Sequence, residues 1–312
     1  MSLVIPVALA VILGWYAFSK FPISEVLPHV KEANIWWVLL GVFLGILSHL
    51  SRAYRWKYLL EPMEHKVKMP NSIMAVFAGY LTNFGIPRSG EVLRAAVLTN
   101  YEEVPFEKGF GTIVAERVAD VLVMLGIIGI TLMLQFDHIL SLLKKIFSLE
   151  KILLGSFALV AIGLLLFLYI NKSKSRLALK VKAFINGLKE GVFSIFKMKH
   201  KWAFIAHTLF IWTMYILMFY VTAFAMPQLS EVTIGMILVA FITASFSIAV
   251  TNGGFIAYPL AVMTSFSLFG IDETPSYAFG WIMWASQTLM LVVLGILSFI
   301  FLPIYNRKKT LV

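Results

Sequence analysis

The sequence predicts an all-α, polytopic integral membrane protein, with about six full spans and two re-entrant helix pairs in two inverted repeats. Three observations predict this class. The 312 residues are 60% hydrophobic and only 13% charged, about half the charged fraction of a typical soluble domain. Apolar stretches of about 20 residues, the length that crosses a bilayer, recur along the chain. Two further apolar stretches are interrupted by glycine, proline or asparagine.

The full spans come first. Six stretches are apolar and long enough to predict a membrane-spanning helix: Leu3–Ser19, Trp36–Ser51, Phe110–Leu134, Ile152–Ile170, Trp202–Met226 and Ala278–Tyr305. The first of these has neither a basic start nor a cleavage site of small residues, so we expect a retained helix and not a signal peptide.

Two apolar regions contain helix breakers. Ser72–Ile86 is interrupted at Gly85 and Pro87 and resumes to about residue 100, and Val232–Val250 is interrupted by Asn252-Gly253-Gly254 and resumes over Phe255–Phe269. Non-helical backbone at membrane depth is tolerated only where it is buried in protein or lines a wet cavity. Each region is therefore expected to form two half-helices that enter and leave on the same side.

The positive charges predict the orientation. The formal net charge is +10, and most of the 26 lysine and arginine residues lie in segments 52–70 and 171–201 and in the tail after residue 306. Short basic segments mark the cytoplasmic side. We therefore expect a multi-pass protein of the cell (inner) membrane with both termini cytoplasmic. Segment 171–201 is expected to form an amphipathic helix on the inner leaflet. Because the basic residues lie beside apolar spans, their positions argue against nucleic-acid binding.

The order of elements suggests an internal repeat. Helix, broken segment and helix begin near residues 36, 72 and 110, and again near 202, 232 and 278. We expect one transmembrane domain, 1–312, with halves of approximately 1–135 and 150–306. Inverted repeats that meet at broken helices are a recurring transporter arrangement. The alternative is that the spacing arises by chance.

Charged residues inside apolar stretches are the main candidate site. Arg88, Glu91 and Arg94 follow Pro87 at helical spacing, so we expect them on one face of a helix that starts near Pro87. Two guanidinium groups beside a helix N-terminus suit a phosphate. The alternative is an ion-pair network that anchors the helix.

A second group of charges lies on the following span. Glu116 and Asp120 share a helix face, with Arg117 beside them. The apolar run that follows is only about 21 Å long, which draws Glu116 toward the hydrocarbon core. We expect pairing with Arg88 or Arg94, either as part of a substrate site or as a structural salt bridge.

The two breaks supply further candidates. Asn83 precedes the first break, and Asn252, Gly253 and Gly254 form the second, where glycine permits close approach of a ligand to the backbone. Ordinary helix capping is the alternative for each. Arg52 and Arg55 lie among aromatic residues at the end of a span, a pattern typical of anchoring at the membrane interface; contact with the substrate is the alternative.

No catalytic constellation is recognisable. The chain has no cysteine, the six histidines show no metal-ligand spacing, and nucleotide and hydrolase motifs are absent. We expect no cofactor, no metal and no enzymatic activity.

These motifs carry a family resemblance. The chain resembles the lysylphosphatidylglycerol synthase transmembrane region family, also described as flippase-like, through four sets of residues: Arg52-x-x-Arg55-Trp56, Asn83-x-x-Ile86-Pro87-Arg88-x-Gly90-Glu91-x-x-Arg94, Glu116-Arg117-x-x-Asp120 and Gly253-Gly254. The resemblance implies two inverted halves and movement of a phospholipid or other polar lipid between leaflets of the bilayer.

The sequence also departs from the family pattern. The proline before the glycine pair and the acidic residue after it are missing here. Bifunctional members carry a soluble aminoacyl-transferase domain after the membrane region, whereas only a short basic tail follows here, so lysyl transfer is not expected. Two other functions remain open: a membrane-embedded lipid-modifying enzyme, and an envelope assembly or regulatory protein without transport activity.

Overall fold

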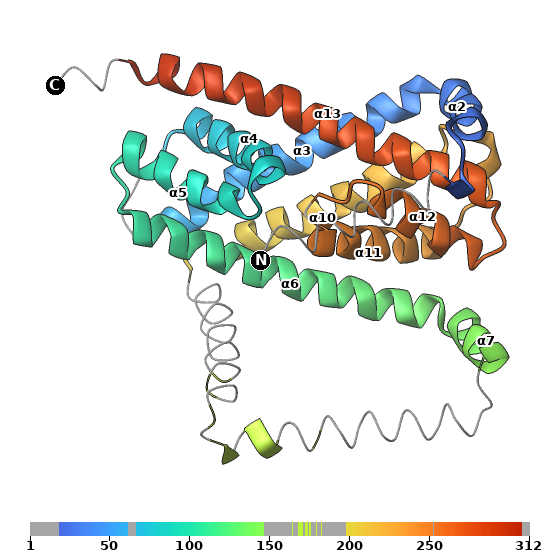
Figure 1. Ribbon diagram of the computed structural model, residues 1–312. Helices are drawn as coiled ribbons and strands as arrows, with labels where there is room; N and C mark the ends of the chain where they lie inside the picture. The colour runs from blue at the N-terminus through green and yellow to red at the C-terminus, as the bar shows by residue number, and fades with distance from the viewer. Residues whose placement is uncertain are drawn as a thin grey trace. The chain divides into compact units, whose positions relative to one another are not determined.

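The computed structural model describes residues 19–61, 67–146, 198–251 and 253–307, with isolated positions between 164 and 182. The regular elements in these ranges are helices (Figure 1), so the predicted all-α class is confirmed. The chain packs as two compact units, one made of Met1–Glu116 with Lys199–Val312 and the other of Arg117–Met198. The predicted single domain and its two halves stay a prediction.

Five helices of the described part are long and apolar enough to cross a membrane. They are α3 (Ile35–Leu60), α6 (Phe106–Leu134), α10 (Lys201–Ala223), α11 (Ile234–Thr251) and α13 (Glu273–Tyr305). Four of them correspond to predicted full spans, and α11 is the first arm of the second broken region. The expected helices Leu3–Ser19 and Ile152–Ile170 and the basic segment 171–201 fall almost entirely outside the described residues.

A close antiparallel contact joins α3 and α10. A Cβ atom on Gly41 would lie 2.2 Å from the Thr222 hydroxyl oxygen, so glycine is what lets the two helices approach. Toward the opposite end of the contact, Ser51 Oγ lies 2.8 Å from His207 Nδ1. Helix α3 continues nine residues beyond the predicted end of its span, to Leu60. The start of the expected basic loop 52–70 is therefore helical.

The first broken region is a helical hairpin. Its arms are α4 (Met69–Gly85) and α5 (Ser89–Glu102), about 26 Å and 21 Å long, each shorter than the roughly 30 Å hydrocarbon core. The arms touch at two glycines, because a Cβ on Gly90 would lie 2.2 Å from the carbonyl oxygen of Gly79. The predicted pair of half-helices is therefore what this region forms.

The second broken region forms a similar hairpin. Helix α11 leads into a turn, and α12 (Ala257–Ser267) follows, about 17 Å long. Three residues of the turn have left-handed backbone: Gly253 at φ 110°, Gly254 at φ 72° and Ile256 at φ 65°. Only glycine adopts such angles without strain, so the glycine pair explains why the helix breaks here. The predicted site residue Asn252 lies outside the described residues.

The long helix α13 packs against α2 (Ile23–Glu32), α3, α4 and α12. Two glycines on α13 make the approach possible: Gly280 lies against Pro259 of α12, and Gly295 lies against Leu81 of α4. The short 3-10 helix η2 (Pro227–Leu229) connects α10 to α11, and α7 (Phe136–Ile146) follows α6. Helix α13 thus contacts one arm of each hairpin.

Candidate functional site

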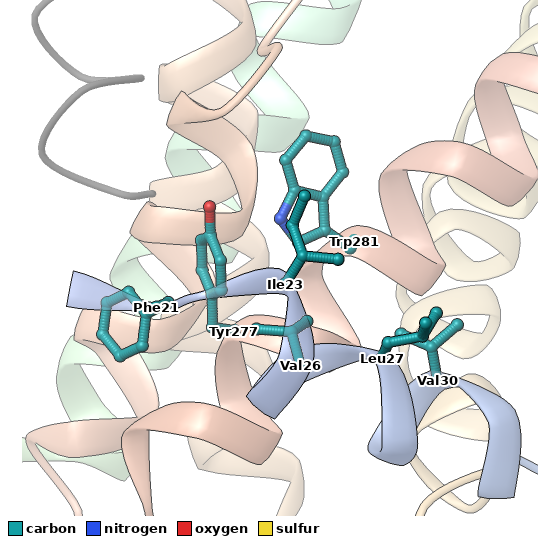
Figure 2. A pocket seen from close by; sticks show the side chains of 7 residues that line it. All are labelled: Phe21, Ile23, Val26, Leu27, Val30, Tyr277 and Trp281. Carbon is teal, nitrogen blue, oxygen red and sulfur yellow. The ribbon is translucent and has the colours of Figure 1, made fainter. Parts of the chain in front are cut away.

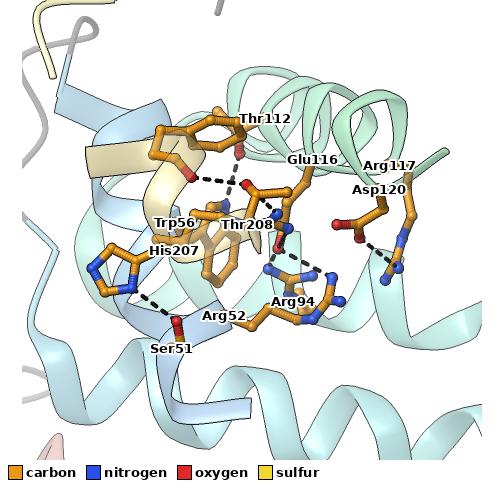
Figure 3. A network of polar contacts seen from close by, with 12 residues as sticks. Ser51, Arg52, Trp56, Arg94, Thr112, Glu116, Arg117, Asp120, His207 and Thr208 are labelled. Carbon is orange, nitrogen blue, oxygen red and sulfur yellow. Dashed lines mark hydrogen bonds and ion pairs between the residues drawn. The ribbon is translucent and has the colours of Figure 1, made fainter. Parts of the chain in front are cut away.

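A buried carboxylate surrounded by arginines is the main polar feature of the larger unit (Figure 3). Glu116 is 0% exposed, and its Oε1 accepts from Arg55 Nη2 at 2.8 Å and from Arg52 Nη1 at 3.4 Å. Its Oε2 accepts from Arg94 Nη2 at 2.8 Å. These four side chains, from α3, α5 and α6, form what we call the arginine–glutamate cluster.

Burial makes this cluster energetically important. None of its arginines exposes more than 5% of its side chain. Charges taken out of water are tolerated only when they are paired and hydrogen-bonded, and losing one partner of a buried pair costs about 3–5 kcal/mol. Three charge-assisted bonds converge on Glu116. The carboxylate therefore links α3, α5 and α6 at one point.

Aromatic and hydroxyl groups enclose the cluster. The Arg94 guanidinium carbon lies 4.3 Å from the centre of the Trp56 ring, and the Trp56 indole donates to Thr112 Oγ1 at 2.8 Å. Arg55 also donates to Thr208 Oγ1 at 2.8 Å. A guanidinium stacked on an indole and forked toward a carboxylate cannot be replaced by lysine without loss. This conformation holds the arginines closed off from solvent.

The prediction for Arg52 and Arg55 was wrong. Their position among aromatic residues suggested anchoring at the membrane interface, yet both are at most 2% exposed and bind Glu116. Their partner lies 61 to 64 residues away in the chain, and no local pattern reveals it. Two signals were available: the spacing of Arg52 and Arg55 on one helix face, and their place in the motifs that carry the family resemblance.

The predicted pairing of Glu116 is confirmed for one of its two candidates. Arg94 reaches Glu116, whereas Arg88 is exposed and makes no hydrogen bond or ion pair with any other described residue. The helix starts at Ser89, not at Pro87, and Arg88 is a left-handed N-cap at φ 61°. Arg88 therefore does not share a helical face with Arg94, and Glu91 lies half-buried between them in the sequence.

The smaller unit contains the remaining predicted charges. Arg117 Nη1 lies 3.5 Å from Asp120 Oδ2, an i, i+3 pair in which 42% of the arginine side chain is exposed. Asp120 itself is buried at 6% exposure. A partly exposed pair at this distance contributes little to stability.

Asn83 has a structural role at the first turn. Its Oδ1 accepts from the backbone N–H of Gly90 at 2.8 Å, which closes the turn between α4 and α5. The second turn is held by Trp284, whose indole donates to the carbonyl of Gly253 at 2.7 Å. At Asn83 the structure shows capping, which was the alternative expected for this residue.

The two hairpin turns lie near each other. A Cβ atom placed on Gly253 would lie 3.9 Å from Phe84 Cδ1. Residues some 170 positions apart in the sequence are thereby adjacent. Across the described ranges, no three histidine, aspartate or glutamate side chains are grouped so that they could hold a metal ion.

Comparison with known families agrees with the motifs. The family model for the lysylphosphatidylglycerol synthase transmembrane region matches residues 3–303. The chain belongs to this family. Within it, the arginine–glutamate cluster unites three of the motifs noted above: Arg52 and Arg55, Arg94, and Glu116.

Similar proteins come from archaea. The UPF0104 membrane protein MJ1595 of Methanocaldococcus jannaschii is 24% identical over 202 residues, covering 58% of this chain and 58% of that protein. The UPF0104 membrane protein PH1989 of Pyrococcus horikoshii is 25% identical over 195 residues, 61% of this chain and 55% of that protein. The chain thus spans just over half the length of these curated relatives.

A third relative is an enzyme by name. The glycosyltransferase AglD of Haloferax volcanii is 27% identical over 110 residues, which cover 35% of this chain but only 18% of that protein. No solved structure matches the chain significantly. Family and composition place this chain among multi-pass membrane proteins related to lipid or envelope metabolism.

Proposed function

We propose that this protein moves a phospholipid or a related polar lipid between the leaflets of the membrane. The closeness of the two hairpin turns, with Phe84 beside Gly253, carries the proposal. Broken helices that end inside a membrane protein bring backbone and polar groups to a depth where continuous helices would present only apolar side chains. Transporters built from inverted repeats bind their substrates where such half-helices meet.

The order of elements supports the repeat. Helix α3, the α4–α5 hairpin and α6 are followed by α10, the α11–α12 hairpin and α13. On the proposed topology both termini face the cytoplasm, the first hairpin enters from the cytoplasmic side and the second from the outside. The inner membrane of the cell is the proposed location, because the basic segments then lie inside.

The arginines receive different roles. Arg88 is exposed at the turn of the first hairpin, where it meets a head-group phosphate first. Arg94 lies six residues further along α5, about 9 Å along the helix axis. Arg94, together with Arg52 and Arg55, stabilises the phosphate when the hairpin moves and the cluster opens, because guanidinium groups match phosphate oxygens. Glu116 holds these arginines in the closed state.

The remaining predicted residues support this site. Glu91 sets the local charge, and Asn83 with the Gly253-Gly254 turn fixes the two hairpin ends. The chain shows no nucleotide-binding motif, so we propose movement down a lipid gradient or coupled to an ion.

A liposome assay tests the proposal. The purified protein is reconstituted with fluorescent anionic, zwitterionic or lysyl-modified phospholipids, and a membrane-impermeant quencher reports the lipid that crosses. We expect protein-dependent transfer of at least one class, reduced at least about fivefold in Arg88→Gln by loss of a charge-assisted bond. Lys108→Gln, which removes an exposed positive charge at the start of α6, is the matched control.

Two results would overturn the proposal. Wild-type protein that transfers none of these lipids, despite a melting curve that shows it is folded, excludes lipid movement and favours an assembly or regulatory role. Conversion of the lipid into a new species, detected by mass spectrometry of the extracted lipids, favours the lipid-modifying enzyme.

A further inference from the structure

An apolar hollow of about 240 Å³ lies between α2 and the first turns of α13 (Figure 2). Seven side chains line it: Phe21, Ile23, Val26, Leu27, Val30, Tyr277 and Trp281. It is separate from the arginine–glutamate cluster. Its volume is just below that of pockets that bury a whole drug-sized ligand, so it accommodates part of a longer molecule.

One edge of the hollow is polar. Tyr277 is only 1% exposed, and its hydroxyl interacts with the side chain of Trp281. The indole nitrogen of Trp281 lies on the side of its ring that faces Tyr277, next to Ile23 (Figure 2). The hollow thus combines an apolar floor with a tyrosine–tryptophan polar pair at one rim.

The hollow lies at an end of the helices. Lys20 Nζ binds Glu273 Oε2 at 2.7 Å, which ties the start of α2 to the start of α13. Tyr277 is four residues into α13, the depth at which tyrosine and tryptophan rings sit at membrane surfaces with one end in water. On the proposed topology this end faces the outside, because neither flanking segment is basic.

Aromatic rings continue from the hollow to the hairpin turns. Tyr277 contacts Trp281 at 6.2 Å between ring centres, and Trp281 contacts Phe255 at 5.6 Å. Phe255 also contacts Trp284 at 5.4 Å, the residue that donates to Gly253 at the second turn. An apolar surface therefore runs from the hollow to the place where the two turns lie near each other.

We propose that the hollow binds one acyl chain of an outer-leaflet phospholipid, with an ester oxygen of the lipid accepting a hydrogen bond from the Tyr277 hydroxyl at the tyrosine–tryptophan pair. A phospholipid matches both features, because its chain is apolar and its ester groups offer acceptors but no donors. The inference rests on the proposed function, for which this hollow is the outer holding site of the lipid. The aromatic surface then guides the chain between the hollow and the turns.

Photo-cross-linking tests the inference. The full chain is reconstituted in vesicles of phosphatidylethanolamine and phosphatidylglycerol that contain a trace of phosphatidylglycerol with a diazirine on one acyl chain. Cross-linked residues are mapped by mass spectrometry. We expect a higher yield on residues 21–30 and 277–281 than around Leu289, an exposed apolar residue of α13 that contacts ordinary surrounding lipid. Equal yields at the two places would overturn the proposal.

Variants distinguish a specific binding site from a nonspecific apolar surface. Leu27→Trp fills the hollow from a residue that is already 42% exposed, and we expect the yield there to fall to the level around Leu289. Tyr277→Phe removes only the hydroxyl and should lower the yield about fivefold, the effect of one ordinary hydrogen bond. Leu289→Trp is the matched control and should change nothing. Unchanged cross-linking in folded Leu27→Trp protein overturns the proposal.

The transfer assay on the same vesicles separates the two proposals. Transfer without enriched cross-linking at the hollow contradicts the holding site and leaves the proposed function standing. Enriched cross-linking that Leu27→Trp abolishes, in a protein that moves no lipid, supports the lipid site and contradicts the proposed function.

Discussion

Replacing Glu116 by glutamine tests how much the arginine–glutamate cluster contributes to stability. Glutamine keeps the shape of the side chain but removes the charge and places an amide N–H₂ where an oxygen now accepts. Two of the three bonds to Glu116 are 2.8 Å long, and all four side chains are buried. Removing one partner from such a group costs about 3–5 kcal/mol. At about 2 °C per kcal/mol for a chain of this size, the expected fall in melting temperature is about 6–10 °C.

The measurement is thermal unfolding of the purified protein in detergent, followed by intrinsic fluorescence at one fixed detergent concentration. Glu107→Gln is the matched control on the same helix, because Glu107 is exposed and makes no hydrogen bond or ion pair with any other described residue. An exposed carboxylate in the first turn of a helix contributes at most about 1 kcal/mol, so the melting temperature of this variant should move by no more than about 2 °C. A Glu116→Gln protein that melts together with this control would refute the reasoning.

Five further substitutions, two of them controls, test the hairpins. Gly90→Ala places a Cβ 2.2 Å from a backbone oxygen of the other arm and should cost about 3 kcal/mol in unfolding free energy. In Gly85→Ala the new methyl meets nothing within 4 Å, so stability should be unchanged. Gly254→Ala should destabilise more than Gly270→Ala, because both force a side chain into left-handed backbone but only the first crowds neighbours at 3.0–3.1 Å. Asn71→Ala removes buried bonds that tie α4 to the ends of α5 and α13, and should cost about 1–3 kcal/mol. Denaturant titration of each protein in detergent compares these costs, and equal midpoints within either glycine pair would contradict the packing argument.

Composition and helix breakers were sufficient to predict much of the fold. The apolar lengths predicted four of the spanning helices, and the breaks at Gly85 and at Gly253-Gly254 predicted both hairpins. The short apolar run after Asp120 also predicted a buried pair for Glu116, because that run alone is too short to cross the hydrocarbon core. These predictions succeeded because each depends on local sequence and on bilayer thickness alone.

The composition of the site was less predictable. Which arginine meets Glu116 depends on how α3 and α5 pack beside α6, through contacts between distant residues such as Gly109 of α6 against Ala95 and Leu98 of α5. Sequence spacing favoured Arg88 equally with Arg94, yet a left-handed residue at the helix start turns Arg88 away. A positive φ angle can be anticipated from the sequence at a glycine or an asparagine, but not at an arginine such as Arg88.

The strength of the contacts along each hairpin indicates where movement is easiest. At its base, the first hairpin is tied by buried hydrogen bonds between the side-chain amides of Asn71 and Asn306, at 2.8 and 3.0 Å, and breaking them leaves buried polar groups without partners. At its tip, the apolar ring of Phe84 lies near Gly253, 3.9 Å from the place that a Cβ on this glycine would take. A lipid chain is as apolar as the phenyl ring that it would displace, so separating the tips costs far less than separating the bases. On the proposed function, the tips therefore part around the lipid while the bases stay fixed, and the exposed Arg88 lies on the part that moves.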